Sequence, residues 1–114
     1  MTIQQESLSS DLWLLQVDGR LDQRQNGDLE QHLLQLLDAD HSSLIVDMTA
    51  VTYINSGGLR CLVTAWRRAK QQGGNLVLCG LNPRLQEIFG MVGFDKVFQI
   101  APSLEMAQAE FQLS

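Results

Sequence analysis

The residues best placed to do chemistry in this chain lie in the segment Asn55-Ser56-Gly57-Gly58-Leu59, at the expected start of a helix. A serine hydroxyl in front of a helix can accept a hydrogen bond from an unpaired backbone N–H group and so cap the helix. Asn55 could cap it instead. The two glycines leave Ser56 open to a partner, and a phosphate on its hydroxyl would lie at the positive end of the helix. The segment therefore supports two interpretations, a structural cap and a phosphorylation switch.

A second segment of interest, Gly19-Arg20-Leu21-Asp22, follows an expected strand and precedes an expected helix. It predicts a turn in which Asp22 acts as a cap. Basic residues also cluster in the helix after Ser56, where they form either a solvated helix face or a binding surface; they are Arg60, Arg67, Arg68 and Lys70.

Other chemistries lack their motifs in this sequence. His32 and His41 could in principle form a hydrolytic triad with Ser56, but the nucleophile-elbow pattern GxSxG is missing and His32 lies among helix leucines. The sequence contains no Walker A lysine motif, no GxGxxG after a strand and no EF-hand spacing of carboxylates. Cys61 and Cys79 have neither CxxC spacing nor a nearby histidine. We therefore expect no enzymatic activity, no cofactor and no bound metal.

Length and charge limit the remaining function classes. The chain has 114 residues, enough for one domain with a real core. Its formal net charge of −5 argues against direct nucleic-acid binding, which needs excess Lys and Arg to displace counterions. The first residues do not predict a signal peptide, and no apolar run approaches the length of a membrane span. These features predict a soluble cytoplasmic protein with reduced thiols and no membrane insertion.

Hydrophobic spacing predicts that strands and helices alternate along the chain. The expected strands are residues 12–17, which can pair with the segment around Ile3, and then 43–48, 76–79 and 97–100. One expected helix carries the leucines at 29, 33, 36 and 37. Three more are expected to start at Asn55, at Asn82-Pro83 and at Pro102-Ser103. Residues 51–54 are expected to form a loop with one or two inward side chains, and Trp13 and Trp66 are assigned to the core. This order predicts right-handed crossovers and a sheet with helices packed against it.

Taken in order, these parts resemble the STAS domain of bacterial anti-anti-sigma factors, which are also called anti-sigma factor antagonists. The resemblance covers nearly the whole chain. It rests on the early strand ending in GRLD, the LIVDM strand, the YINSGGL turn, the RRAKQQGGNLVLCGLNPRLQEIFGMVGF segment, and a closing strand and helix. It implies a single STAS domain over residues 1–114, with an α/β fold in which a mixed β-sheet carries about four helices packed mainly on one face.

The resemblance also implies a mechanism called partner switching. The unphosphorylated domain binds an anti-sigma factor that is also a serine kinase, and the sigma factor is released. The kinase then uses ATP to phosphorylate the domain, and the complex dissociates. A metal-dependent PP2C-type phosphatase resets the cycle. ATP and metal belong to these partners, so the resemblance implies no cofactor for this chain.

The family pattern transfers to individual residues of this sequence. Its motif is Asp-Ser-Ser/Thr-Gly-Leu, and the phosphoacceptor, the serine directly after the Asp, matches Ser56. The family's Asp in the GxLD turn, which lies close to the acceptor, matches Asp22. Asn55 replaces the motif's Asp, which removes a negative charge, and Gly57 replaces its second hydroxyl residue, which is expected to loosen the turn. The implied partner-binding residues are Asp22, Asn55, Ser56, Gly57, Gly58 and Leu59.

An alternative within the same family stays open at this point. STAS domains also occur in stress-sensing complexes, in anion transporters and beside lipid-transport ATPases, and some of them do not use the serine. The chain could therefore be a structural STAS subunit that is not phosphorylated, which the substitutions at Asn55 and Gly57 favour slightly. The sequence leaves the formation of homo-oligomers undecided.

Overall fold

The structure is a computed structural model that describes residues 2–9 and 11–112. The ends of the expected domain, residue 1 and residues 113–114, lie outside the described residues, as does residue 10. The elements, in chain order, are β1 (Ile3–Ser9), β2 (Leu12–Leu21), α1 (Asn26–Asp38), β3 (Ser43–Ile54), α2 (Ser56–Gln71), β4 (Asn75–Cys79), α3 (Pro83–Met91), a 3-10 turn (Phe94–Lys96), β5 (Gln99–Ala101) and α4 (Leu104–Gln112). This is the alternating order that the hydrophobic spacing predicts.

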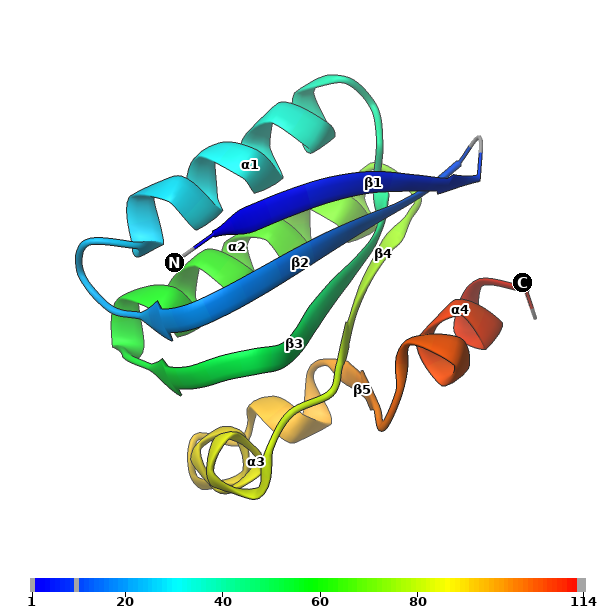
Figure 1. Cartoon of the computed structure of the whole chain (residues 1–114). Helices are drawn as coiled ribbons and strands as arrows, with labels where there is room; N and C mark the ends of the chain where they lie inside the picture. The colour runs from blue at the N-terminus through cyan, green and yellow to red at the C-terminus, as the bar shows by residue number, and fades with distance from the viewer. Residues whose placement is uncertain (1, 10, 113–114) are drawn as a thin grey trace.

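The five strands form one sheet in the order β1-β2-β3-β4-β5 (Figure 1). The edge strand β1 is antiparallel to β2, whereas β2, β3, β4 and β5 run parallel to one another. Parallel neighbours need crossover connections, and helices supply them here. The mixed sheet, with the segment around Ile3 as its antiparallel edge, is confirmed.

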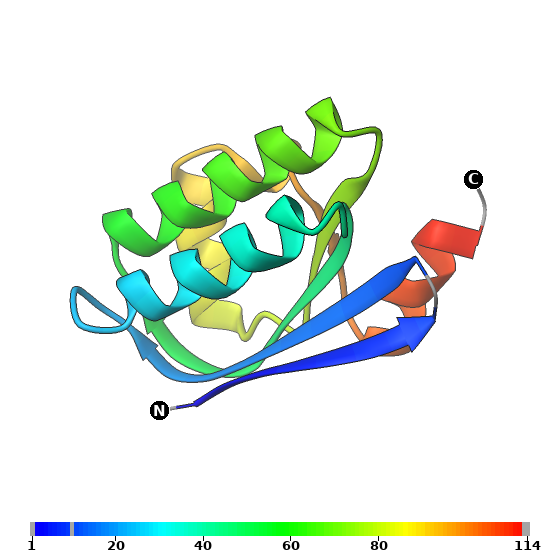
Figure 2. The same cartoon turned by 90° about the horizontal axis from the view of Figure 1, so that it is seen from above.

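The helices cover the two faces of the sheet unequally, with α1, α2 and α3 on one face and α4 on the other (Figure 2). Successive side chains of a strand point to opposite faces. In β3, Leu44 and Val46 pack in the core beneath the three helices, whereas Ile45 packs with Ala107 of α4. Both faces are buried at this point, so residues 44–46 of the strand are apolar at every position. The α/β fold with helices mainly on one face is confirmed.

Strand β3 is longer than the sequence predicts. Residues 51–54, expected to be a loop, belong to the strand and pair with the end of β2 in the register Gly19↔Val51, Arg20↔Tyr53 and Leu21↔Ile54. The apolar alternation fades there because two register shifts interrupt the pairing, so the strand has no regular period of two. The expected inward side chains are present, since Val51 and Ile54 are buried.

The C-terminal part of the sheet and the two tryptophans also differ from expectation in detail. The last strand starts at Gln99 rather than at residue 97, because Phe98 turns into the core after the 3-10 turn.

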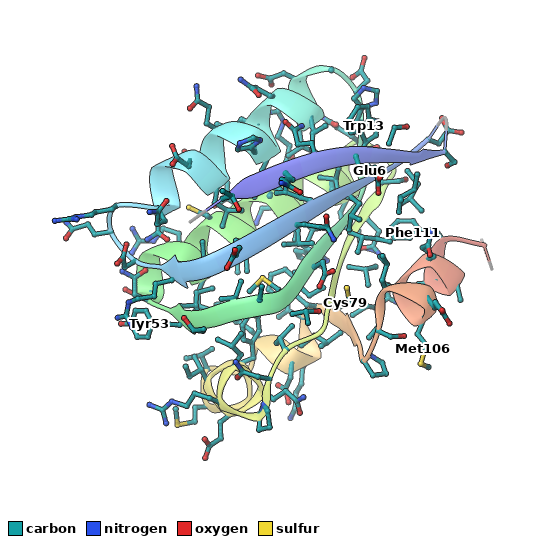
Figure 3. All side chains as sticks on the ribbon, in the orientation of Figure 1. Glu6, Trp13, Tyr53, Cys79, Met106 and Phe111 are labelled. Atoms are coloured by element: carbon teal, nitrogen blue, oxygen red, sulfur yellow. The ribbon has the colours of Figure 1, made fainter. Side chains whose placement is uncertain are left out.

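Trp13 and Trp66, assigned to the core, are half-buried and pack against it. Trp13 contacts the ring of His41, with ring centroids 4.8 Å apart, and its position is labelled in Figure 3.

Candidate functional site

The two segments singled out in the sequence meet at one edge of the sheet. Strands β2 and β3 are parallel neighbours, so their carboxyl ends lie side by side (Figure 1). The backbone N–H of Asn55 donates to the carbonyl oxygen of Leu21 at 3.1 Å, which joins the two strand ends directly. The structure therefore brings the turn that contains Asp22 next to the start of α2.

Asn55, and not Ser56, caps helix α2. Its backbone is extended, and its side-chain Oδ1 accepts the N–H of Gly58 at 3.0 Å. Its backbone carbonyl accepts the N–H of Leu59 at 3.1 Å. Ser56 is already the first residue of the helix, too far along the chain to act as its cap.

Ser56 is left with an unused hydroxyl at the surface. Its side chain is exposed, and within the described part of the chain its hydroxyl makes no hydrogen bond. The first N–H groups of an α-helix have no acceptor inside the helix and carry its partial positive charge. The hydroxyl is thus placed where an added anion would be stabilised.

The glycines after Ser56 make room for a side chain from α1. The Nδ2 of Asn26, the first residue of α1, donates to Asn55 Oδ1 at 2.8 Å. A Cβ atom on Gly57 would lie 2.6 Å from Asn26 Nδ2, and one on Gly58 would lie 2.8 Å from Ile54 Cγ1. The Asn26 amide therefore fills the space that a side chain at position 57 would take, and the expectation that Gly57 loosens the turn stays a prediction.

Sequence reasoning missed Asn26, although the sequence carries a weak signal for it. Residues three and four apart lie on the same face of a helix. Asn26 precedes Leu29 by three positions, and Leu29 and Leu33 are buried, so Asn26 falls on the inner face of α1. A polar residue at an inward position next to a helix start is an indication of such a contact.

Asp22 closes the turn before α1 and does not cap the helix. Its Oδ1 accepts the N–H of Arg24 at 3.1 Å, and its carbonyl oxygen accepts the N–H groups of Gln25 and Asn26, both at 3.0 Å. The residue at the cap position of α1 is Gln25, whose side chain makes no capping bond. The half-buried Asp22 is therefore held in a tight turn beside the start of α2.

Arg20 and Tyr53 lie at the paired strand ends that lead into the Asp22 turn and the start of α2, and sequence reasoning missed both. They face each other across β2 and β3, and the Arg20 guanidinium lies 4.3 Å from the centroid of the Tyr53 ring. Arg20 also approaches Asp22, with Nε 4.0 Å from Oδ2. Tyr53 is 37% exposed and points outward at the end of β3 (Figure 3). Exposed arginine and tyrosine are residue types enriched at the energetic centres of protein interfaces.

The remaining residues implied by the family pattern point inward. Leu59 is only 8% exposed and belongs to the core beneath the helices. Gly58 is buried against Ile54. Of the four clustered basic residues on α2, Arg68 forms an ion pair with Asp38 at the end of α1, and the exposed ones are Arg60, Arg67 and Lys70.

Neither histidine is placed to activate Ser56. The His32 Nδ1 lies 2.9 Å from Gln5 Oε1 of β1, and His41 precedes β3 whereas Ser56 follows it. In the described ranges no group of three or more His, Cys, Asp or Glu side chains could hold a metal ion. No helix in this part of the chain is long and apolar enough to cross a membrane.

Both thiols are held in their protonated form. Burial, with the nearby Glu30 carboxylate as the second cause, raises the pKa of the Cys61 thiol. Burial, and then the charge of Asp47 and a hydrogen bond to it, raises the pKa of Cys79 to about 12. A thiol needs its thiolate form to act as a nucleophile or metal ligand, so neither cysteine offers that chemistry at neutral pH.

Comparison with known proteins identifies the family. A model of the STAS domain matches residues 4–107. The chain belongs to the STAS domain family. This STAS domain is 36% identical over 84 residues to BtrV of Bordetella bronchiseptica, which is assigned as an anti-sigma factor antagonist; the match covers 74% of this chain and 72% of BtrV. It is 37% identical over 57 residues to an anti-sigma-B factor antagonist of Listeria monocytogenes, and this match covers half of each protein.

A solved structure agrees with the fold of this STAS domain. The Bacillus cell fate determinant SpoIIAA in its phosphorylated form superposes with a TM-score of 0.77 at 14% identity, over 96% of this chain and 99% of SpoIIAA. At that level of identity the likeness extends to the fold alone.

Proposed function

We propose that this STAS domain is an anti-sigma factor antagonist that works by partner switching, with Ser56 as its phosphoacceptor. The observation that carries the proposal is the unused, exposed hydroxyl of Ser56, which is available because Asn55 caps α2 in its place. The two relatives named as anti-sigma factor antagonists support the choice of partner class. The domain is the substrate of phosphoryl transfer and not its catalyst.

In the unphosphorylated state, the partner is an anti-sigma factor with serine kinase activity. It docks on the edge that Ser56, Gly57, Asn55 and the Asp22 turn form together, with Arg20 and Tyr53 beside them. The backbone at this edge is fixed by the bond from Asn55 N–H to Leu21, so little order has to be gained on binding. Gly58 and Leu59 do not contact the partner directly; they pack the first turn of α2 against the core and so fix its position.

The kinase ends this complex by chemistry on Ser56. A bond forms between the Ser56 oxygen and the γ-phosphorus of ATP, the bond from that phosphorus to the oxygen of ADP breaks, and a base on the kinase takes the hydroxyl proton. The new phosphate lies at the start of α2, where the helix dipole stabilises it, so the domain keeps its fold. A metal-dependent PP2C-type phosphatase later removes the phosphate by hydrolysis.

Release follows from adding a dianion to a tight contact. The phosphate adds about −1.5 to −2 charge and several atoms to a surface that the partner covers closely. A loss of about 3 kcal/mol weakens binding roughly a hundredfold, which is enough to exchange partners. In this account the domain works in the cytoplasm, where the sigma factor and its inhibitor meet.

A binding assay with a candidate kinase tests the proposal. The domain is mixed with anti-sigma kinases from the same genome and ADP, and the complex is isolated by gel filtration before ATP is added. We expect a complex that ATP dissociates for the unaltered domain and one that persists after ATP for Ser56→Ala. A stable complex that ATP and Ser56→Asp both leave intact would instead identify a structural STAS subunit and refute the switch.

A further inference from the structure

The contact between Asn26 and the start of α2 carries a consequence for Ser56 itself. Asn26 Nδ2 donates to Asn55 Oδ1 at 2.8 Å, and the same oxygen accepts the N–H of Gly58 at 3.0 Å. The capping oxygen is thus held from two sides, one on α1 and one on α2. Ser56 lies between Asn55 and Gly57 in the chain, so the position of its hydroxyl depends on this bridge.

Position 57 and Asn26 compete for one space. A Cβ atom on Gly57 would lie 2.6 Å from Asn26 Nδ2, a distance that real Cβ contacts essentially never show. The amide could swing away only by giving up its bond to Asn55, and on the other side its Oδ1 would lie 3.0 Å from a Cβ on Gly58. A side chain at position 57 and the Asn26–Asn55 bond therefore exclude each other.

Asn26 is also costly to the domain. Its Oδ1 is buried and has no hydrogen-bond partner within the described part of the chain. Turning the amide over would place that oxygen against Asn55 Oδ1, so the unpaired orientation is forced. A buried acceptor without a partner lowers stability, and alanine at this position would avoid that penalty. The unpaired Oδ1 therefore offsets part of the stability that the bond from Asn26 Nδ2 to Asn55 contributes.

We propose that Asn26 is a positioning residue for Ser56, and that Asn26, Asn55 and Gly57 work as one unit. From α1, Asn26 fixes the capping orientation of Asn55 and takes the space that a second hydroxyl residue at position 57 would need. The departure of this chain from the family motif at position 57 then follows from its residue at position 26. The role in phosphorylation rests on the proposed function, whereas the structural coupling does not.

A double-mutant cycle tests the coupling without any partner. The proteins are the unaltered domain, Gly57→Ala, Asn26→Ala and the double variant, and the readout is the thermal unfolding midpoint. Gly57→Ala should lower the midpoint when Asn26 is present and raise it when Asn26→Ala has cleared the space, a difference of about 5 °C between the two backgrounds. If Gly57→Ala alone fails to fold and the double variant folds, the coupling is confirmed in its strongest form.

Gly27→Ala is the matched control for this cycle. Gly27 also lies in the first turn of a helix, but nothing lies within 4 Å of an added Cβ atom there. It should raise the midpoint slightly in both backgrounds. Equal shifts for Gly57→Ala with and without Asn26 would overturn the proposal.

Hydrogen exchange of one amide separates positioning from general stability. The Gly58 N–H reports directly on Asn55 Oδ1, and the Leu85 N–H reports on the corresponding cap of α3 by Asn82. Asn26→Asp keeps the volume of Asn26 but cannot donate to Asn55. It should speed exchange at Gly58 about tenfold and leave Leu85 unchanged. Unchanged exchange at Gly58 would contradict the positioning role.

Phosphorylation by the cognate kinase completes the test. Asn26→Ala and Asn26→Asp should slow the gain of phosphate on Ser56 about tenfold at a temperature where both are fully folded. A normal rate in both variants would limit Asn26 to a structural role and overturn its part in positioning Ser56. A kinase that phosphorylates none of the proteins would count against the proposed function, while the unfolding cycle and the exchange data would still decide the coupling.

Discussion

Two helices of this domain begin with an exposed serine, and they use it differently. Ser103 precedes α4, and its hydroxyl accepts the N–H of Met106 at 3.3 Å, so it serves as a cap. Ser56 stands at the start of α2, where Asn55 already accepts the corresponding N–H. Among the described residues, the hydroxyl of Ser103 is engaged and that of Ser56 makes no hydrogen bond. A serine hydroxyl at a helix start is thus left available when a different residue caps the helix.

The start of α3 shows that an asparagine cap alone does not make a site. Asn82 accepts the N–H of Leu85 at 2.8 Å, and its own amide donates to the carbonyl oxygen of Val51 at 3.1 Å. The next residue is Pro83, which fits the first helical position but offers no hydroxyl. Helices α2 and α3 are each capped by an asparagine, but only in α2 is the asparagine followed by a serine and two glycines.

The largest expected effect is on partner binding, where a negative charge at Ser56 and one at Ser103 should act differently. Ser56→Asp should weaken the complex with the anti-sigma kinase about a hundredfold, because it adds a negative charge to the contact. Ser103→Asp keeps a side chain that can cap α4, so it should change the dissociation constant less than about twofold. Isothermal titration of both variants measures the difference. Similar losses for the two would show that charge anywhere on the domain weakens binding.

The next effect compares the caps by their contribution to stability. Asn55→Ala removes the cap of α2 and also leaves Asn26 Nδ2 unpaired, so the free energy of unfolding should fall by about 2 kcal/mol. Asn82→Ala removes a cap and the donor to the Val51 carbonyl oxygen but leaves no buried amide side chain unpaired, so it should cost about 1.5 kcal/mol. Ser103→Ala, with its longer and exposed bond, should cost about 0.5 kcal/mol. Urea unfolding at neutral pH gives all three values. A smaller loss for Asn55→Ala than for Asn82→Ala would mean that the Asn26 bridge adds nothing.

At alkaline pH, the two thiols, Cys61 in α2 and Cys79 before α3, should contribute unequally to the loss of unfolding free energy. Because the pKa of Cys79, at the end of the strand that leads to α3, is raised from 9.0 to about 12, the unfolded chain gives up this proton first. Stability therefore falls as the pH rises from about 9 towards 12, and by pH 10 this thiol accounts for about 1 kcal/mol of the loss. Cys79→Ala should flatten the alkaline decline measured by urea unfolding. Equal declines in the variant and the unaltered domain would contradict this assignment.

Cys61→Ala is the matched control for that measurement. Cys61 lies in α2 and is only half-buried, whereas Cys79 is fully buried. Its pKa is raised in the same direction, so its removal should also flatten the decline, by a smaller amount.

The smallest effect comes from placing an acid directly before Ser56, the proposed phosphoacceptor. In Asn55→Asp the carboxylate can still accept from Gly58 N–H and from Asn26 Nδ2, and it adds a negative charge at the start of α2. We expect a gain of about 0.3–1 kcal/mol in unfolding free energy at low salt, reduced at 1 M salt. Asn82→Asp at α3 is the contrasting variant: its carboxylate cannot donate to the carbonyl oxygen of Val51 as the Asn82 amide does, so it should gain less stability or lose some. A loss of stability in Asn55→Asp would show that the Asn26 bridge requires a neutral partner.

The sequence predicted the fold, and the start of α2 as the place of the candidate site, because both predictions rest on local patterns; the fold is confirmed and the site stays a prediction. Alternating apolar segments defined the sheet, and the glycines beside Ser56 marked the helix start. The parts it missed depend on strand register. Asn26 and Asn55 are 29 positions apart, and the facing of Arg20 and Tyr53 follows from a pairing that contains two shifts. No local spacing encodes such contacts, so the packing against Gly57 became evident only in three dimensions, and only the structure decided between Asn55 and Ser56 as the cap.

The most direct test of the central claim is the site of phosphate transfer. Intact mass and peptide mapping would follow the unaltered domain, Ser56→Ala and Ser103→Ala during incubation with ATP and the anti-sigma kinases of the same genome. The account predicts one added phosphate, located on Ser56, in the unaltered domain and in Ser103→Ala, and none in Ser56→Ala. A phosphate that persists in Ser56→Ala, or a kinase that binds the domain tightly and never modifies it, would contradict the claim that the free hydroxyl of Ser56 is the switch.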